Sequence, residues 1–292
     1  MSAPPVILCL GRFYCDVIFT GLPRMPSPGT EVFCEGVGFH SGGGAAITAA
    51  HLTALGNATA LAAILPGPPM GDLILHELTD PGVNLDLCET ANPGTEPQMT
   101  VALTQGGERA FVTHRAGPAI PKISAAAAKA LGVTHIHLGE MTTLIDHPDV
   151  LDLARALGAT LSLDCSWDEE LDPHRVEALL PRIDVFLPNA AEAQLLRDMG
   201  LSEPFAPLTV VKEGEAGATA YAAETPLHAP AHPARVIDTT GAGDAFNAGF
   251  LDAWLQKEPL VVCLEAGNAA GAKAVSYRGG IGPALNCRRA AS

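Results

Sequence analysis

One short stretch of the chain, residues 236–251, combines residue types that bind an anion with a carboxylate that can accept a proton. It reads Val-Ile-Asp-Thr-Thr-Gly-Ala-Gly-Asp-Ala-Phe-Asn-Ala-Gly-Phe-Leu, so a turn of small residues, Gly241, Ala242 and Gly243, leads into an apolar helix whose first turn carries Asp244. The first N–H groups of a helix lack a partner within it, and the helix dipole adds positive potential there, so an anion is favoured. The pattern predicts a phosphate site with a base, Asp244, inside it.

A helix cap is the alternative interpretation of Asp244, since the same N–H groups stabilise an acidic residue at a helix start. A cap needs only one Ser, Thr, Asp or Asn. Here Asp238, Thr239 and Thr240 precede a three-residue turn that no cap requires. We therefore favour a functional role for the whole stretch.

Apolar runs and helical stretches alternate along the chain. The runs, which are typical of buried parallel strands, cover residues 5–10, 60–65, 135–138, 161–163, 185–187 and 208–211. The helical stretches cover residues 45–55, 124–131, 148–157, 174–180 and 190–199. This order predicts a layered α/β fold with a mostly parallel central sheet. Residues 12–39 and 96–115 interrupt the order, and we interpret them as a small discontinuous β lid in which 99–104 and 109–113 form a hairpin.

Polar residues follow three of the expected strands, at the sheet edge where open α/β sheets bind ligands. Asp164 follows residues 161–163, Asn189 comes soon after the next strand, and Lys212 follows residues 208–211. Taken singly, each is better explained as a turn residue.

A glycine run near the N-terminus forms a second candidate site. Residues 11–16 follow the first expected strand, and Ser41-Gly42-Gly43-Gly44 opens the helix over residues 45–55. Consecutive glycines let another molecule approach the backbone closely. A flexible loop capped by Ser41 explains a lone glycine run better, so this candidate depends on the distal stretch.

The composition of the 292 residues suits a compact protein with one large α/β domain or two ordinary ones, since 48% are hydrophobic and 17% charged, with 30 Gly and 24 Pro. Lys plus Arg total 17 against 32 Asp plus Glu, for a formal net charge of -15. Because nucleic-acid binding depends on basic residues, we expect no nucleic-acid partner. A polyanion such as ATP would need local positive potential from helix termini, a few basic residues and a metal ion.

The seven cysteines are odd in number and include no Cys-x-x-Cys pair, so they indicate neither a disulfide framework nor a zinc site. The first residues lack the features of a signal peptide, and no segment approaches the length of a membrane span. We expect a cytoplasmic protein with no membrane partner.

The Asp-Thr-Thr-Gly-Ala-Gly-Asp stretch, residues 238–244, resembles the C-terminal signature of the PfkB/ribokinase family of carbohydrate kinases, and weaker matches follow in family order over most of the chain. The resemblance implies a single ribokinase-like catalytic domain over residues 1–292, with a layered α/β/α fold and a small β-sheet lid. In that family the Gly-Ala-Gly amides bind the transferring phosphoryl group and the last Asp is the general base, which here would be Asp244.

On the acceptor side, the resemblance implies that Asp16 holds substrate hydroxyls and that Gly42 and Gly43 lie over the sugar. One departure is informative, because Ile47 occupies a position where many sugar kinases of the family carry Asn. An Ile side chain cannot form a hydrogen bond, so the acceptor differs from ribose or fructose at this point or another group substitutes.

On the nucleotide side, Asn189-Ala190-Ala191-Glu192 resembles the family's Asn-x-x-Glu motif, whose Asn approaches the phosphates and whose Glu organises Mg²⁺ through water. A capping box explains the same pair at least as well. The resemblance also implies that Lys212 adds a point charge beside the ATP phosphates, and a solvated lysine is the alternative.

Four further positions complete the set that the resemblance implies. Gly214 and Gly217 belong to a glycine turn beside the phosphates, and Asn268 lies in a segment similar to the lining of the adenine pocket, although close helix packing explains its small neighbours equally well. The carbonyl oxygens of Asp238 and Thr240 would bind a monovalent cation, K⁺, as in some members of the family.

Two features of the sequence have a mainly structural interpretation. His135 and His137 lie on one face of a strand, but no third metal ligand is evident, so we interpret them as core or edge histidines. Arg109, in the lid hairpin, would clamp an acidic substrate, and an exposed arginine explains it equally well.

The sequence therefore predicts a kinase that uses ATP and Mg²⁺ to phosphorylate a hydroxyl group of a sugar or sugar-like acceptor. A nucleoside kinase on the same scaffold is the alternative within enzymes, and a non-catalytic ligand-binding member of the fold is the alternative outside them. Unpaired edges of the lid strands favour a homodimer formed through the lid.

Overall fold

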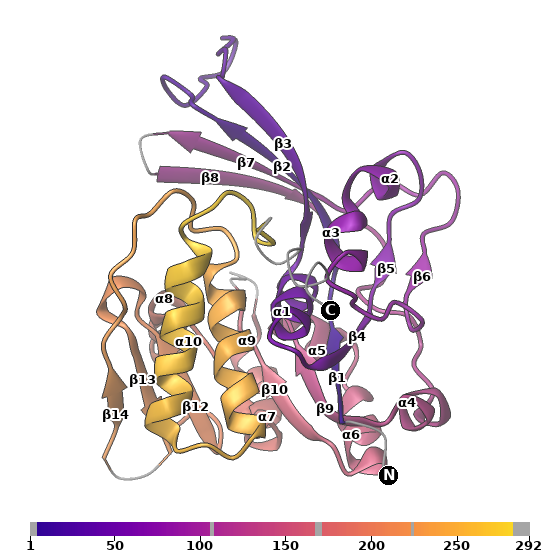
Figure 1. The fold of residues 1–292 in the computed structure, drawn as a ribbon, viewed down its shortest axis with the longest axis vertical. Coiled ribbons are helices and arrows are strands. Elements are labelled where there is room, and N and C mark those ends of the chain that lie inside the picture. The colour runs from indigo at the N-terminus through magenta and orange to yellow at the C-terminus, as the bar shows by residue number, and fades with distance from the viewer. Residues whose placement is uncertain (1–4, 106–107, 167–170, 223–224, 283–292) are drawn as a thin grey trace, which may run out of the picture.

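A computed structural model describes residues 5–105, 108–166, 171–222 and 225–282. Its main feature is a large sheet with the strand order β14-β13-β12-β11-β10-β9-β1-β4 (Figure 1). The strands are β1 (Val6–Leu10), β4 (Ala58–Ala62), β9 (Val133–Leu138), β10 (Thr160–Leu163), β11 (Val185–Phe186), β12 (Leu208–Lys212), β13 (Ala218–Tyr221) and β14 (Leu227–Ala229). The strands from β12 to β4 run parallel, whereas β13 and β14 join antiparallel. The predicted mostly parallel sheet is confirmed.

The helices lie on both faces of this sheet. They are α1 (Gly44–Ala54), α2 (Met70–Ile74), α3 (His76–Thr79), α4 (Ala125–Leu131), α5 (Met141–Asp146), α6 (Val150–Leu157), α7 (Pro173–Leu179), α8 (Ala190–Asp198), α9 (Ala242–Leu255) and α10 (Leu260–Ala274). None of the helices in the described part of the chain combines the length and the apolar character that crossing a membrane requires.

Local signals fix the ends of several helices. The Ser124 hydroxyl accepts the Ala127 N–H at the start of α4, and Asp172 caps α7, whose first residue is Pro173. The helices α4 and α6 end at Gly132 and Gly158, whose φ angles of 80° and 64° lie in the left-handed region. The sequence carries these signals, which is why most helix positions are predicted well.

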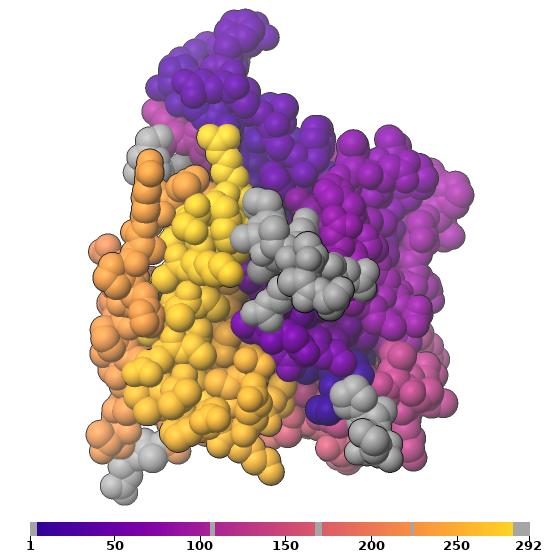
Figure 2. Space-filling view, in the orientation of Figure 1, coloured from indigo at the N-terminus to yellow at the C-terminus, as the bar shows by residue number. Residues whose placement is uncertain are grey.

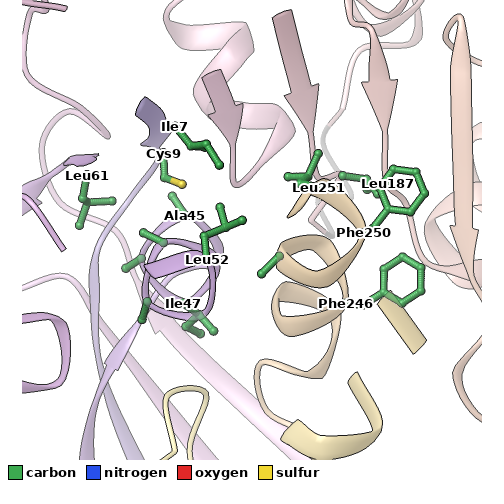
Figure 3. Close-up of a cluster of buried hydrophobic side chains, with 14 of the residues drawn as sticks. Ile7, Cys9, Ala45, Ile47, Leu52, Leu61, Leu187, Phe246, Phe250 and Leu251 are labelled. Carbon is green, nitrogen blue, oxygen red and sulfur yellow. The ribbon is translucent and has the colours of Figure 1, made fainter. Parts of the chain in front are cut away.

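The alternation of side chains along β1 shows the layers. Ile7 and Cys9 pack with α1, α9 and α10 in one buried cluster, part of which Figure 3 shows. Leu8 and Leu10 pack with α4 to α8 in the other cluster. Because successive residues of a strand point to opposite faces, the large sheet is buried on both sides in an α/β/α arrangement.

A second, four-stranded sheet rises from one end of this body, as Figures 1 and 2 show. Its order is β3-β2-β7-β8, from β2 (Tyr14–Thr20), β3 (Gly36–Gly42), β7 (Met99–Gln105) and β8 (Glu108–His114). These strands come from the two intervals that interrupt the βα order, although β3 continues to Gly42, beyond residue 39. β7 and β8 pair antiparallel. The turn at residues 106–107 lies outside the described residues.

The short helices α2, α3 and α5 were not predicted, and two further details differ from the prediction. The run at residues 60–65 divides into β4 and a separate short strand, β5 (Ile64–Leu65), which pairs with β6 (Glu89–Thr90). The antiparallel strands β13 and β14 were not predicted. They are four and three residues long, β13 consists of small residues apart from Tyr221, and two of the three side chains of β14 are exposed, so they give no clear apolar run.

Candidate active site

Asp244 lies in the first turn of α9, which begins at Ala242. Gly241, before it, has a φ angle of 71°, in the left-handed region that favours glycine. The Ala242 N–H donates to the Thr239 carbonyl oxygen at 3.3 Å. The N–H groups of Gly243 and Asp244 have no acceptor within the helix, because they belong to its first turn, so they are available to an anion.

Gly42 ends β3, Gly43 connects it to α1, and Gly44 begins α1, and two of these glycines pack against carboxyl groups. A Cβ atom on Gly42 would lie 2.2 Å from Asp16 Oδ1, and one on Gly44 would lie 2.9 Å from Asp244 Oδ1. Gly43 caps α1 with a φ angle of 98°. The chain's own packing therefore requires glycine here. The start of α1 brings together the carboxyl groups of the N-terminal and C-terminal motifs, whose charges interact.

Side chains from the ends of β10 and β12 and from α9 form a buried polar cluster. Lys212 Nζ donates to Asp164 Oδ1 and Oδ2 at 3.0 and 2.9 Å, and to Asn247 Oδ1 at 3.1 Å. The Asn247 amide also donates to Asp164. A Cβ atom on Gly243 would lie 3.4 Å from Lys212 Nζ, so the cation lies beside the turn that precedes Asp244. Lys212 is not a solvated lysine.

The carboxyl groups around this cluster have raised pKa values. Burial and the charge of Asp164 raise the pKa of Asp244 to about 7, although the Lys212 cation opposes them. Burial raises the pKa of Asp16 to about 7 as well. Burial alone would lower the pKa of Lys212, but the carboxylates of Asp164 and Glu192 raise it overall. A carboxyl group with a pKa near 7 is suited to general-base catalysis at neutral pH.

Asn189 and Glu192 form a reciprocal capping box at the start of α8. The Asn189 N–H donates to Glu192 Oε2 at 2.7 Å, and the Glu192 N–H donates to Asn189 Oδ1 at 2.9 Å. Burial, and after it the charge of Asp164, raise the pKa of Glu192 to about 7. The predicted capping box is confirmed. Both residues also line the first cavity described below, and their role at the phosphates and Mg²⁺ stays a prediction.

Two cavities share Lys212, Gly214 and Gly243 in their walls. The first cavity has a volume of about 690 Å³ and lies between the large sheet and the small one; its wall includes Tyr14, Asp16, Gly43, Gly44, Thr100, Phe111, Arg115, Glu140, Asp164, Asn189, Glu192 and Asp244. The second cavity has a volume of about 740 Å³, and its wall includes Gly217, His232, Ala242, Phe246, Asn268 and Ala272. Asp244 therefore stands near the junction of the two cavities.

The acceptor-side residues of the sequence analysis separate in the structure. Asp16 and Gly43 line the first cavity, whereas Gly42 is buried against Asp16 and is not among the wall residues. Ile47 is 3% exposed and belongs to the core (Figure 3). A Cβ atom on Gly280 would lie 2.5 Å from Ile47 Cδ1, so Ile47 packs against the backbone there and does not line the cavity.

On the nucleotide side, Gly217 and Asn268 lie in the wall of the second cavity. Gly217 has a φ angle of 111°. The Asn268 side chain is buried and donates to the carbonyl oxygens of Ala229 and Pro230 at 3.0 and 3.1 Å. Asn268 thus holds the chain after β14 in place, a contact that the sequence did not indicate.

Asp238 and Thr240 bind an arginine of the small sheet. Arg109 Nη1 donates to Asp238 Oδ1 at 3.2 Å and to Thr240 Oγ1 at 2.7 Å. Burial would raise the pKa of Asp238, but the N–H groups of Gly279 and Thr240 and the Arg109 cation lower it overall. With its side chain 18% exposed and paired within the chain, Arg109 is not the exposed arginine of the alternative interpretation, and its role as a substrate clamp stays a prediction.

His135 and His137 are core residues, as the sequence favoured. His135 bonds to Thr160 and Ser162 at 2.7 and 2.8 Å, and His137 Nδ1 bonds to Ser162 at 2.9 Å. Burial lowers the pKa of both imidazoles. The described residues contain no group of three or more His, Cys, Asp or Glu arranged to hold a metal ion.

Several residues of the first cavity were missed by sequence reasoning. Thr100 and Phe111 from the small sheet lie on its wall, together with Glu140 and Arg115. Side chains alternate between the two faces of a strand, and this alternation along β7 and β8 could have placed Thr100 and Phe111 on the same face of the small sheet as Asp16. No motif marks the other two.

The model of the pfkB family carbohydrate kinases matches residues 7–287. The chain belongs to this family. It is 27% identical over 286 residues to the ATP-dependent ribose-1-phosphate kinase of Halopiger xanaduensis, covering 94% of this chain and 93% of that protein. Two other curated relatives are matched over only 44% and 51% of their own length, so the chain spans about half of each.

Solved structures of a ribokinase and of a nucleoside kinase share the fold. The ribokinase of Arabidopsis thaliana, complexed with ribose and ATP, has a TM-score of 0.79 and 24% identity, covering 96% of this chain and 95% of that one. The nucleoside kinase of Burkholderia thailandensis, in complex with inosine, has a TM-score of 0.79 and 20% identity, covering 94% and 92%. The predicted ribokinase-like fold is thereby confirmed.

Proposed function

We propose that this protein is a kinase that transfers the γ-phosphoryl group of ATP to a hydroxyl group of a sugar or sugar-like acceptor. The observation that carries the proposal is the position of Asp244. Its carboxyl group has a pKa of about 7, belongs to the anion-binding first turn of α9, and lies near the junction of two cavities large enough for two substrates.

In the proposed reaction, the acceptor occupies the first cavity, with a hydroxyl group held by Asp16 and directed at Asp244. Asp244 takes the hydroxyl proton as the new oxygen–phosphorus bond forms and the bond from the γ-phosphorus to the β-phosphate oxygen breaks, which releases ADP. The N–H groups of Gly243 and Asp244 stabilise the charge on the transferring group. We assign a smaller part to Ala242, whose N–H already donates to Thr239.

The second cavity suits the nucleotide. Gly214 and Gly217 leave its wall open to a phosphate chain, Asn268 fixes the backbone beside the adenine end, and Lys212 adds positive charge at the junction. Asp164 neutralises part of that charge, so Lys212 acts on the phosphates as one member of a cluster. Lys212 also lowers the pKa of Asp244, which keeps more of the base ionised.

Magnesium fits the carboxyl groups at the junction. Glu192 has one oxygen in the capping box and lines the first cavity, as does Asp164. Mg²⁺ is usually held by one or two carboxylates, waters and substrate phosphates, and these two carboxyl groups meet that need. When bound, Mg²⁺ neutralises charge on the phosphates.

A monovalent cation at the carbonyl oxygens of Asp238 and Thr240 stays a prediction. Its support is the resemblance alone. The contacts of Asp238 with Arg109, Thr240 and Gly279 are made by its side-chain oxygens and not by its carbonyl oxygen. A comparison of kcat in K⁺ and in tetramethylammonium salts tests it.

The small sheet is proposed as a lid that excludes water from the first cavity. The face opposite Asp16 exposes apolar side chains, because the register places Val37, Phe39 and Val112 on it and they are 55%, 41% and 69% exposed. A second copy of the chain pairing through this face would bury it, which supports the predicted homodimer. Light scattering of the protein and of Val112→Glu tests the dimer, and a monomeric parent protein would contradict it.

A nucleoside acceptor is the second candidate. Phe111 lines the first cavity and offers an aromatic face to a base. We expect a cytoplasmic protein in either case, since the cysteines that the structure describes are all free, as in a reducing compartment.

An acceptor screen tests the proposed function. ADP release is measured against pentoses, hexoses, ketoses, sugar acids and nucleosides, with Asp244→Asn beside the parent protein and Asp80→Asn as a control on an exposed residue outside both cavities. We expect one acceptor class to stimulate ADP release by the parent protein and by Asp80→Asn, and no acceptor to stimulate it in Asp244→Asn. A chain that binds acceptor and ATP but transfers nothing would instead be the non-catalytic member of the fold.

A further inference from the structure

One ion pair joins the small sheet to the turn that precedes α9. We call residues 238–243 the anion loop. Arg109, on β8, donates from Nη1 to Asp238 Oδ1 and Thr240 Oγ1, and the side chains of Arg109 and Asp238 are 18% and 9% exposed. A pair this buried is screened little by solvent, and the guanidinium touches the loop that shapes the anion site.

The Asp238 carboxylate is the centre of the anion loop. Oδ1 accepts the N–H and the hydroxyl of Thr240 at 2.9 and 2.7 Å, and Oδ2 accepts the Gly279 N–H at 3.0 Å. Thr240 directly precedes Gly241, the N-cap of α9. The position of the Arg109 cation therefore affects the position of the first turn of α9, which carries Asp244.

The other side of Arg109 faces the acceptor region. Its guanidinium carbon lies 5.9 Å from the centroid of the Phe111 ring, and Phe111 is a wall residue of the first cavity. Thr113, two residues further on the same face of β8, lines the cavity as well. A short chain of contacts thus runs from the acceptor cavity through Phe111 and Arg109 to the anion loop.

We propose that Arg109 is a positioning residue that couples seating of the small sheet over the acceptor to the geometry of the anion loop. This inference rests on the proposed kinase function. In the seated state Arg109 fixes Asp238 and Thr240, so that the Gly243 and Asp244 N–H groups and the Asp244 carboxylate are aligned for transfer. Arg109 is not among the wall residues of either cavity, so we expect it to act on kcat and to leave both binding steps largely unchanged.

The test compares Arg109→Met and Arg109→Lys with Arg24→Met. Arg24 is an exposed arginine in the connection between β2 and β3, where it bonds only to nearby residues such as Thr30, so it is a matched control. We expect Arg109→Met to lower kcat about tenfold or more, the scale of a lost charged hydrogen bond, with the KM for the acceptor and the Kd for ATP within about threefold of the parent. Arg109→Lys is expected in between, and Arg24→Met unchanged.

Two further readouts separate positioning from simple loss of structure. Arg109→Met should release more ADP per phosphorylated acceptor than the parent, because the unseated sheet admits water. A cycle with Thr240→Val, which removes the Oγ1 acceptor, should be strongly non-additive in kcat, since both variants break the same contact. Additive effects, or an Arg109→Met variant with the kcat of Arg24→Met, would overturn the inference.

A readout that needs no turnover distinguishes this inference from the proposed function. Hydrogen exchange of the ligand-free protein should be faster over residues 238–243 in Arg109→Met than in Arg24→Met. A parent protein that phosphorylates no acceptor refutes the function. Equal exchange in the two variants, or a rise in the KM for the acceptor alone, refutes the coupling, and the latter result would make Arg109 the acceptor clamp.

Discussion

Removal of the Lys212 cation should destabilise the protein strongly. Lys212 Nζ lies 2.9 and 3.0 Å from the two Asp164 oxygens and 3.1 Å from Asn247 Oδ1, and both members of the ion pair are only 11% exposed. Lys212→Met keeps most of the side-chain length but leaves the Asp164 carboxylate buried without its counterion. Removal of one partner of such a pair costs about 3–5 kcal/mol, so we expect a loss of about 3 kcal/mol or more in the free energy of unfolding.

Urea unfolding at pH 7.5 measures this loss. Lys122→Met, which replaces an exposed lysine, is the control, and its free energy of unfolding should stay within about 0.5 kcal/mol of the parent. Asp164→Asn combined with Lys212→Met should recover part of the loss, because the buried charge is then absent.

The loss should also depend on pH. Lys212 lowers the pKa values of Asp244 and Glu192, which burial raises to about 7. Without Lys212 the pKa values of Asp244 and Glu192 rise further. A buried carboxyl group whose pKa is raised in the folded state destabilises the folded protein as the pH increases toward that pKa. The deficit should therefore be larger at pH 8 than at pH 6, and a loss under about 1 kcal/mol would refute this account of the cluster.

Three other outcomes are expected. The value of kcat/KM for the acceptor should fall as pH decreases through about 7, because Asp244 must be ionised and its folded pKa is raised to about 7; a profile flat down to pH 5 would contradict this. Gly44→Ala should lose about 1–3 kcal/mol in the free energy of unfolding and at least tenfold in kcat, since its Cβ atom would lie 2.9 Å from Asp244 Oδ1. In the control Gly67→Ala the nearest atom to the added Cβ lies at 3.9 Å, so both the unfolding free energy and kcat should change little. Asn268→Ala should lose about 1–3 kcal/mol and raise the KM for ATP, because it leaves the two backbone carbonyl groups it now binds without that donor; an unchanged KM would separate this contact from the nucleotide cavity.

The layered fold and the anion turn could be predicted because local signals carry them. Gly132 and Gly158 each follow a short run of helix-forming residues and mark its end, and the small turn before Asp244 marks a helix start without any knowledge of tertiary structure. The edge strands β13 and β14 carry no such signal, because they are short and pair antiparallel at the margin of the sheet.

The contacts between the motifs could not be predicted. Asp164, Lys212 and Asn247 come from three elements separated by 35 to 83 residues, and each alone is an ordinary turn or helix residue. Arg109 meets Asp238 across 129 residues. Ile47 could be recognised as a departure from the family, but only the packing of Gly280 against it shows that the side chain belongs to the core.

Replacement of Asp244 by Asn tests the central claim most directly. The amide has nearly the same shape as the carboxyl group and cannot accept the hydroxyl proton. With the acceptor found by screening, the measurement is kcat together with the Kd for ATP by titration calorimetry. We predict that kcat falls by about a hundredfold or more while the Kd for ATP stays within about threefold of the parent. A variant with near-normal kcat would contradict the role of Asp244 as the base.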